Sequence, residues 1–202
     1  MVVSTRLILC WIELTTVSFP QKLRVSISIE LEGVTNVRPA DDDYEYFFTV
    51  MCSSCREVHP KTVGLNRNAS ALSTINTTQG DEHEISGSKG SANFVWRCTN
   101  CKKEHSASFL PSAPKSKSTA PLPYSNSSQF SSFVTLDCRG LEFTEFHLRR
   151  GKWVCEGEDS GKAFEIDWDE LAQEGEERWD DYDEDKGEAV GVSELKSKVE
   201  RA

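Results

Sequence analysis

One stretch, Leu23-Arg-Val-Ser-Ile-Ser-Ile-Glu-Leu31, alternates apolar and polar side chains at every position. Apolar residues at every second position give a strand one hydrophobic face, so this pattern predicts a half-buried β-strand. Gly33 ends the stretch, and a second alternating run from Tyr44 to Val50 leads directly into Cys52. The sequence therefore predicts a β fold in which a strand delivers a cysteine to its end.

Other short apolar runs extend this pattern along the chain. Phe94 and Trp96 lie on one face of a run that reaches Cys98, and another strand begins after Cys101. Runs of the same kind lead to Cys138 and Cys155, and few segments show helical periodicity. The predicted fold class is mainly β, with two similar small antiparallel β-sheet lobes of sandwich or barrel type and few short helices.

A short internal echo supports the idea of two lobes. Gly33-Val34 precedes an aromatic strand that ends at Cys52, and Gly140-Leu141 precedes one that ends at Cys155. Either an old duplication or the turn-and-strand pattern common to β-rich chains explains the echo.

Composition divides the chain into four parts. Residues 1–21 are expected to form an N-terminal extension, either an extra strand or disordered, and residues 22–110 a first β lobe, which contains two closely spaced pairs of cysteines. Residues 111–128 hold four of the seven prolines together with many serines, which is typical of a linker or a long surface loop. Residues 129–202 form the second β lobe, which contains an acidic segment at 156–188.

The charge of the protein is concentrated in that acidic segment. The chain has 23 Lys and Arg against 33 Asp and Glu, and residues 156–188 alone hold 16 acidic and 3 basic residues. Such acidity argues against a nucleic-acid partner and predicts either a solvated face or a docking surface for a basic protein. No apolar run reaches the roughly 18 residues that span a bilayer, so no membrane role is expected.

Two cysteine pairs of identical spacing carry the chemistry. They are Cys52-Ser-Ser-Cys55 and Cys98-Thr-Asn-Cys101, separated by 42 residues. Two residues between cysteines let both sulfurs face one ion across a tight turn, and two such pairs complete a tetrahedral four-sulfur site. The expected cofactor is one Zn²⁺ per chain, which makes residues 22–110 a zinc-binding β lobe. A site closed by four sulfurs keeps no open position for water, so the zinc is expected to be structural.

Neighbouring residues leave alternatives open. His59 and His105 each follow the second cysteine of a pair by four residues, and either could ligate the metal or lie outside its ligand shell. Arg56 and the cations beside the second pair could offset the charge of the thiolates or be ordinary solvated residues. A thioredoxin-like use of Cys52 and Cys55 is disfavoured, because no helical pattern follows the pair.

The stretch from Gly87 to Phe109, GSKGSANFVWRCTNCKKEHSASF, resembles the eukaryotic family of CXXC motif containing zinc binding proteins. Further blocks that resemble it are Leu31-Glu-Gly-Val-Thr-Asn-Val-Arg-Pro39, Asp137-Cys-Arg-Gly-Leu-Glu-Phe143, Glu158-Asp-Ser-Gly161 and Trp179-Asp-Asp-Tyr-Asp-Glu184. The resemblance covers residues 22–190. It implies a small monomeric protein of two similar β lobes, without established enzymatic activity, whose one zinc is held by Cys52, Cys55, Cys98 and Cys101.

The expected function is therefore binding and not catalysis. We expect a structural zinc protein that acts through a protein partner in the cytoplasm, or also in the nucleus. Two matched metal-binding pairs within an odd total of seven cysteines suit a reducing compartment, and Cys10, Cys138 and Cys155 are expected to be buried reduced thiols. The alternative is a metal-handling protein whose thiolates pass zinc or copper(I) to a partner. An enzyme site around Trp153, Trp179 and nearby carboxylates is a third and weaker hypothesis.

Overall fold

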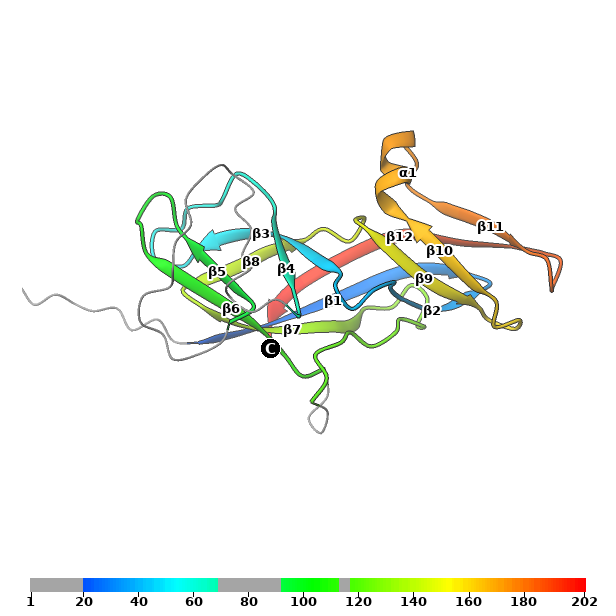
Figure 1. The fold of residues 1–202 in the computed structure, drawn as a ribbon, viewed down its shortest axis with the longest axis horizontal. Coiled ribbons are helices and arrows are strands. Elements are labelled where there is room, and N and C mark those ends of the chain that lie inside the picture. The colour runs from blue at the N-terminus through cyan, green and yellow to red at the C-terminus, as the bar shows by residue number, and fades with distance from the viewer. Residues whose placement is uncertain (1–19, 69–91, 113–116) are drawn as a thin grey trace, which may run out of the picture.

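The computed structural model describes residues 20–68, 92–112 and 117–202, which form strands and one short helix (Figure 1). The elements are β1 (Gln21–Glu32), β2 (Val34–Pro39), β3 (Glu45–Cys52), β4 (Val63–Asn66), β5 (Phe94–Arg97), β6 (Glu104–Leu110), β7 (Ser131–Arg139), β8 (Leu141–Phe146), β9 (Lys152–Gly157), β10 (Ala163–Asp167), α1 (Trp168–Glu174), β11 (Trp179–Asp183) and β12 (Glu188–Arg201). The predicted extension lies outside the described residues up to position 19, and Gln21 already belongs to β1.

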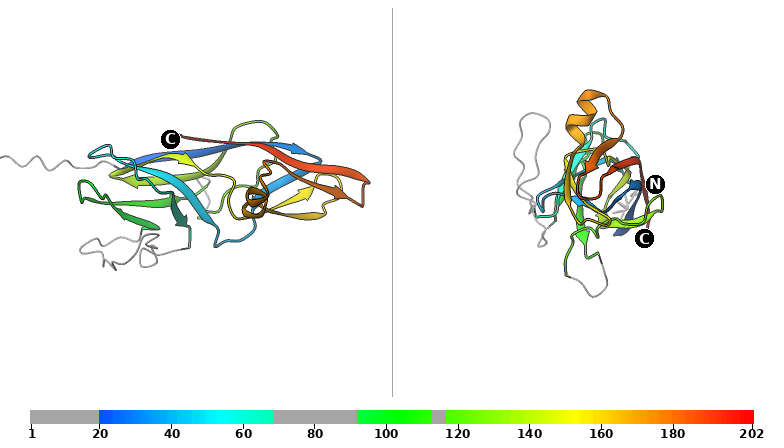
Figure 2. Two further views of the ribbon diagram at one scale, coloured as in Figure 1. Left: turned by 90° about the horizontal axis from the view of Figure 1, so that it is seen from above. Right: turned by 90° about the vertical axis from the view of Figure 1, so that its right-hand side faces the viewer.

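The strands form one large and two small antiparallel sheets. The six-stranded sheet has the order β11-β12-β1-β7-β6-β5, and the three-stranded sheets have the orders β10-β9-β2 and β4-β3-β8. The molecule is elongated, and β1 and β12 run along its long axis (Figures 1 and 2). The predicted mainly β, antiparallel fold class is confirmed.

The chain traces the same path twice. Strands β7 to β12 repeat the pairing of β1 to β6, so that β1 corresponds to β7, β3 to β9 and β6 to β12. The two halves of the sequence exchange one strand each. β2, from the first half, pairs with β9, and β8, from the second half, pairs with β3. The two lobes are thus similar, but each end of the molecule contains strands from both halves of the sequence. The division into residues 22–110 and 129–202 as domains stays a prediction.

The core follows the alternating patterns, with one difference. On β3, Tyr46, Phe48 and Val50 are buried, in agreement with the predicted face. On β1 the apolar residues from Leu23 to Ile29 are buried and Leu31 is partly buried, but Ser26 and Ser28, which were expected to face solvent, are buried too. β1 lies inside the large sheet between β12 and β7, and its short serines stand beside longer side chains, because β12 places lysines at both paired positions.

Part of the predicted Pro/Ser-rich loop is anchored to the sheets. The buried hydroxyl of Tyr124 accepts a hydrogen bond from the backbone N–H of Ile29 at 3.0 Å. The backbone of Tyr124 also pairs with Val37, with both N–H to O distances at 2.9 Å. Residues 124–128 therefore pack across β1 and β2, while residues 69–91 and 113–116 lie outside the described residues.

The acidic segment occupies the end of the molecule formed by β10, α1 and β11 (Figure 1). Asp167 caps the N-terminus of helix α1, because its carboxylate accepts the backbone N–H groups of Asp169 and Glu170. Trp153 and Trp179, the two tryptophans of the third hypothesis, are both buried in the hydrophobic core, and an enzyme site around them stays a prediction. Within the described ranges, no helix has the length and apolar character needed to cross a membrane.

Candidate metal centre

The first cysteine pair lies in a tight turn after β3. The N–H of Cys52 donates to the carbonyl of Glu57 at 2.8 Å, and the N–H of Arg56 donates to the carbonyl of Cys52 at 2.8 Å. Arg56 has a φ of 61°, in the left-handed region that non-glycine residues seldom adopt. This backbone geometry is what reverses the chain within a few residues and brings both sulfurs to one side.

The second pair repeats this turn between β5 and β6. The N–H of Cys98 donates to the carbonyl of Lys103 at 3.0 Å, and the N–H of Lys102 donates to the carbonyl of Cys98 at 3.0 Å. Lys102 has a φ of 60°, matching Arg56. The two cysteine pairs are therefore held by equivalent backbone turns, as their identical spacing predicted.

The four sulfurs converge on one point. The Cys52 and Cys101 Sγ atoms lie 3.6 Å apart, the Cys55 and Cys98 Sγ atoms lie 3.5 Å apart, and all four lie within 4.8 Å of one another. A zinc ion with Zn–S bonds of about 2.3 Å requires neighbouring sulfurs about 3.8 Å apart in a tetrahedron. The donor set and its spacing fit a zinc ion, and the predicted convergence of the two pairs is confirmed.

A glycine turn brings the two pairs together across the intervening sequence. β6 pairs with β7 and β3 pairs with β8, so the β7–β8 turn at Gly140 lies between the turns that hold the two cysteine pairs. The carbonyl of Gly140 accepts the N–H of Ser53 at 2.9 Å, and this hydrogen bond joins the turn of the first cysteine pair to the Gly140 turn. The part played by Gly140 was not evident from the sequence, since its partners are remote and it carries no side chain.

The four thiols differ in exposure. Cys52 and Cys98 are fully buried, whereas Cys55 and Cys101 are half-buried. Burial raises the pKa of the Cys52 thiol to about 11, and the backbone N–H of Glu57 lowers the pKa of the Cys55 thiol to about 7. One sulfur of each pair is thus sheltered by the strands and the other faces outward.

The two candidate histidines take different positions beside the cluster. His105 is buried, and its Nε2 lies 3.2 Å from the Cys52 Sγ. Both histidine rings contact Trp96, with centroid distances of 5.7 Å for His59 and 5.6 Å for His105. Burial lowers the pKa of both imidazoles. His105 therefore contacts a sulfur of the cluster, and the structure shows no such contact for His59.

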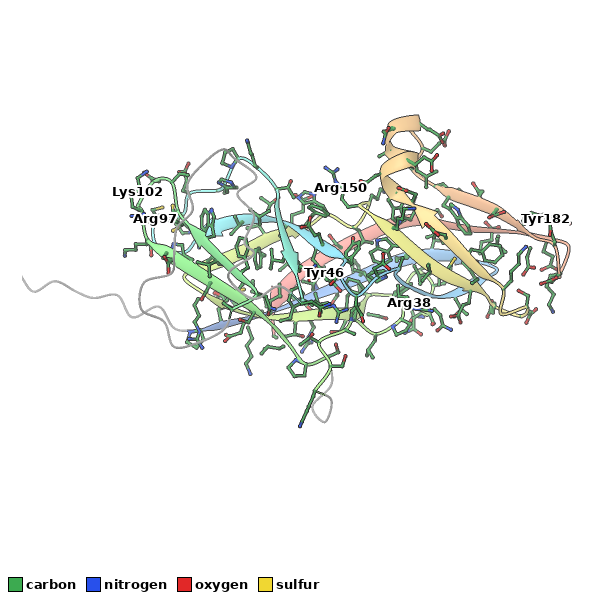
Figure 3. The ribbon with its side chains drawn as sticks, in the orientation of Figure 1. Arg38, Tyr46, Arg97, Lys102, Arg150 and Tyr182 are labelled. Carbon is green, nitrogen blue, oxygen red and sulfur yellow. The ribbon has the colours of Figure 1, made fainter. Side chains whose placement is uncertain are left out.

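The flanking cations gather at the same end of the molecule. Figure 3 places Arg97 and Lys102 together there, and the Nε of Arg97 donates to the carbonyl of Lys102 at 3.0 Å. Arg56 is exposed and lies 3.5 Å from a carboxylate oxygen of Glu142. The described cysteines outside the cluster, Cys138 and Cys155, are buried free thiols, as predicted, whereas Cys10 lies outside the described residues.

Sequence comparison finds relatives over most of the chain. The family model for the eukaryotic CXXC motif containing zinc binding protein matches residues 24–200. A UPF0587 protein of Schizosaccharomyces pombe is 34% identical over 182 residues, which cover 90% of this chain and 99% of that protein. A CXXC motif containing zinc binding protein of Homo sapiens is 30% identical over 174 residues, which cover 86% of this chain and 94% of that protein.

Comparison with solved structures finds proteins of similar fold. The crystal structure of C1orf123 matches with a TM-score of 0.69 at 28% identity, covering 90% of this chain and 99% of that chain. A hypothetical protein from Plasmodium falciparum matches with a TM-score of 0.66 at 23% identity, covering 89% of this chain and 99% of that chain. At 23% identity, the likeness to the Plasmodium falciparum protein shows a shared fold alone.

Proposed function

Because the chain belongs to the eukaryotic family of CXXC motif containing zinc binding proteins, we propose that Cys52, Cys55, Cys98 and Cys101 together bind one structural zinc ion. The observation that carries this proposal is the convergence of the four sulfurs, within 4.8 Å of one another, on two equivalent turns. Zinc bound there ties the β3 turn to the β5–β6 turn, so metal binding contributes free energy to folding.

Metal analysis of a ligand variant tests this proposal. We expect the purified wild-type protein to contain one zinc per chain, and Cys98→Ser to lose zinc and melt at a lower temperature, because three sulfurs leave the coordination shell open. The matched control is Cys155→Ala, which removes a buried free thiol outside the cluster. This control should keep its zinc whatever its stability. Unchanged zinc content and melting temperature in Cys98→Ser would disprove the proposal.

We propose that the protein acts through a protein partner, with the acidic end as the contact surface. Residues 156–188 carry a net charge of −13, and Tyr182 on β11 is 53% exposed at the tip of this end (Figure 3). An exposed aromatic ring amid carboxylates suits a basic protein surface. Neutralising Asp180, Asp181 and Glu184 to amides should weaken binding of the partner and reduce its salt dependence. Binding that stays the same in this variant contradicts the assignment.

Transfer of the metal is the second candidate function. It is favoured by the half-buried Cys55 and Cys101, which present two ligand sulfurs toward solvent, where a partner thiol can reach them. A transfer site exchanges its metal with a moderate chelator within minutes while the fold persists. A structural site releases its metal only as the protein unfolds. Parallel measurement of metal release and of circular dichroism separates the two functions.

A further inference from the structure

The imidazole of His105 lies within hydrogen-bonding distance of one of the four sulfurs. The His105 Nε2 and the Cys52 Sγ are 3.2 Å apart, and both side chains are buried. The ring packs against Trp96 on one side, and its Nδ1 would lie 2.1 Å from a Cβ atom at Gly140. The imidazole is therefore held in one place, with Nε2 directed at Cys52.

The opposite end of the molecule contains the same backbone turns without cysteines. The N–H of Gly157 donates to the carbonyl of Lys162 at 2.8 Å, and the N–H of Gly161 donates back to Gly157 at 2.9 Å. These bonds match those of Cys52 and Arg56 in direction and in spacing. Likewise, Glu158 donates to the carbonyl of Gly33 at 3.0 Å, as Ser53 does to the carbonyl of Gly140.

The second turn of that end completes the correspondence. The N–H of Gly187 donates to the carbonyl of Asp183 at 2.7 Å, as the N–H of Lys102 does to the carbonyl of Cys98. The four cysteine positions therefore correspond, in chain order, to Gly157, Ser160, Asp183 and Lys186. In place of a sulfur cluster, this end has a hydrogen bond from the Ser160 hydroxyl to the Asp183 carboxylate at 2.5 Å.

The residue that corresponds to His105 in this cysteine-free end is Val190. It follows Asp183 by seven positions, as His105 follows Cys98. Its Cγ1 would lie 3.0 Å from a Cβ atom at Gly33, so valine packs over the Gly33 turn as histidine packs over the Gly140 turn. The fold thus accepts an aliphatic side chain at this position of the repeat. A histidine occupies it only in the half whose turns carry the four cysteines.

From this we propose that His105 is a positioning residue of the metal centre, whose Nε2–H donates a hydrogen bond to the Cys52 thiolate. This inference rests on the proposed zinc site. A donor at this sulfur withdraws negative charge from a cluster that carries a formal charge of about −2 with zinc bound, and it fixes the direction of the sulfur lone pairs. His105 therefore retains the metal at the sheltered sulfur, while Cys55 and Cys101 remain open to solvent.

The zinc affinities of three variants test the role of His105. His105→Val installs the residue of the cysteine-free end, and His105→Gln keeps an N–H donor. His59→Val is the matched control, because His59 has the same spacing from its cysteine pair and also contacts Trp96. We expect His105→Val to lose about 10- to 100-fold in zinc affinity, as is usual when a partner of a metal ligand is removed. His105→Gln should recover part of this loss, and His59→Val should bind zinc like the wild type.

A measurement on the wild-type chain keeps the test independent of folding defects in the variants. In protein loaded with ¹¹³Cd, a hydrogen bond to Cys52 gives scalar coupling between the metal and the Hε2 proton of His105. Absence of this coupling, or equal affinity in His105→Val and His59→Val, overturns the inference. X-ray absorption that shows a nitrogen ligand in addition to the four sulfurs also overturns it, since His105 would then be a ligand. Zinc without a four-sulfur shell would instead refute the proposed function itself.

Discussion

Gly140 turns the chain from β7 to β8 directly beneath His105. Its φ is 77°, and an added Cβ atom would lie 2.1 Å from the His105 Nδ1. We expect Gly140→Ala to lower the free energy of unfolding by about 3 kcal/mol, because the left-handed backbone costs an L-residue roughly 1–2 kcal/mol and overpacking adds roughly 1–3 kcal/mol. Urea denaturation of the zinc-loaded protein measures this change.

Gly161 provides the matched control for this prediction. It has a similar φ of 67°, but a Cβ atom there would meet nothing within 4 Å. Gly161→Ala should therefore lower the free energy of unfolding only by the backbone contribution, roughly 1–2 kcal/mol. An equal decrease in the free energy of unfolding in the two variants would show that the close approach of His105 to Gly140 adds nothing to the cost of the substitution.

Residue spacing predicted the four cysteines but not their surroundings. Each pair is encoded locally, since two intervening residues suffice to turn both sulfurs to one side. The contact of His105 with Cys52 joins positions 53 apart in the sequence. It depends on how β6 and β3 are placed by β7 and β8, and spacing carries no information about that placement.

At the scale of elements, Tyr124 fastens the segment 117–128 to β1. Its buried hydroxyl accepts the N–H of Ile29, and in Tyr124→Phe that N–H loses its side-chain partner inside the protein. We expect Tyr124→Phe to lower the free energy of unfolding by about 1–3 kcal/mol, the usual cost of a buried donor without an acceptor. Amide hydrogen exchange at Ile29, together with denaturant unfolding, measures the effect.

Ser127 offers a control on the same segment. Its hydroxyl accepts the N–H of Leu31 at 2.9 Å, but this hydrogen bond is exposed, so water replaces the hydroxyl in Ser127→Ala. A loss in Ser127→Ala as large as that in Tyr124→Phe would contradict the argument from burial.

Alternation predicted the strands better than composition predicted the connections. Period-two patterns identified β1 and β3, because one face of each strand packs on the core. They could not show that Ser26 and Ser28 are buried, since this depends on neighbours from β12 and β7. Proline and serine content suggested a linker or loop at 111–128, but hydrogen bonds of Tyr124, Ser125 and Ser127 to β1 and β2 position its last residues.

At the scale of the whole molecule, the repeat predicts that a second zinc site can be built. The corresponding positions are Gly157, Ser160, Asp183 and Lys186, and a Cβ atom at Gly157 would point at Ser160 and Asp183, 2.2 and 2.7 Å from their oxygens. We expect the variant with cysteine at all four positions to bind one more zinc per chain than the wild type. Metal analysis and the Co²⁺ thiolate absorption band measure the gain.

The control for this design carries alanine at position 157 and cysteine at the other three. With three thiolates it should bind the added zinc more weakly than the four-cysteine variant, since the tetrahedral shell is incomplete. A four-cysteine variant that folds, fills its first site and gains no zinc would show that the two ends are not equivalent as metal scaffolds.

The repeat was partly visible in the sequence. The Gly33 and Gly140 turns, each followed by an aromatic strand, indicated it. The exchange of β2 and β8 between the halves was not visible, because a strand looks the same in sequence whichever partner it pairs with. Sequence patterns thus predicted two similar lobes, and strand pairing determines which segments each end contains.

The pairing of β1 with β12 has a consequence for biosynthesis. Ribosomes make the chain from its N-terminus, so β1 and all four clustered cysteines leave the exit tunnel before the residues of β12 are joined. β8, which pairs with the cysteine-bearing β3, also emerges after the last of these cysteines. A nascent chain thus exposes its thiols to cellular metal and oxidants before their sheltering strands exist, and β12 must be synthesised before β1 gains its second neighbour.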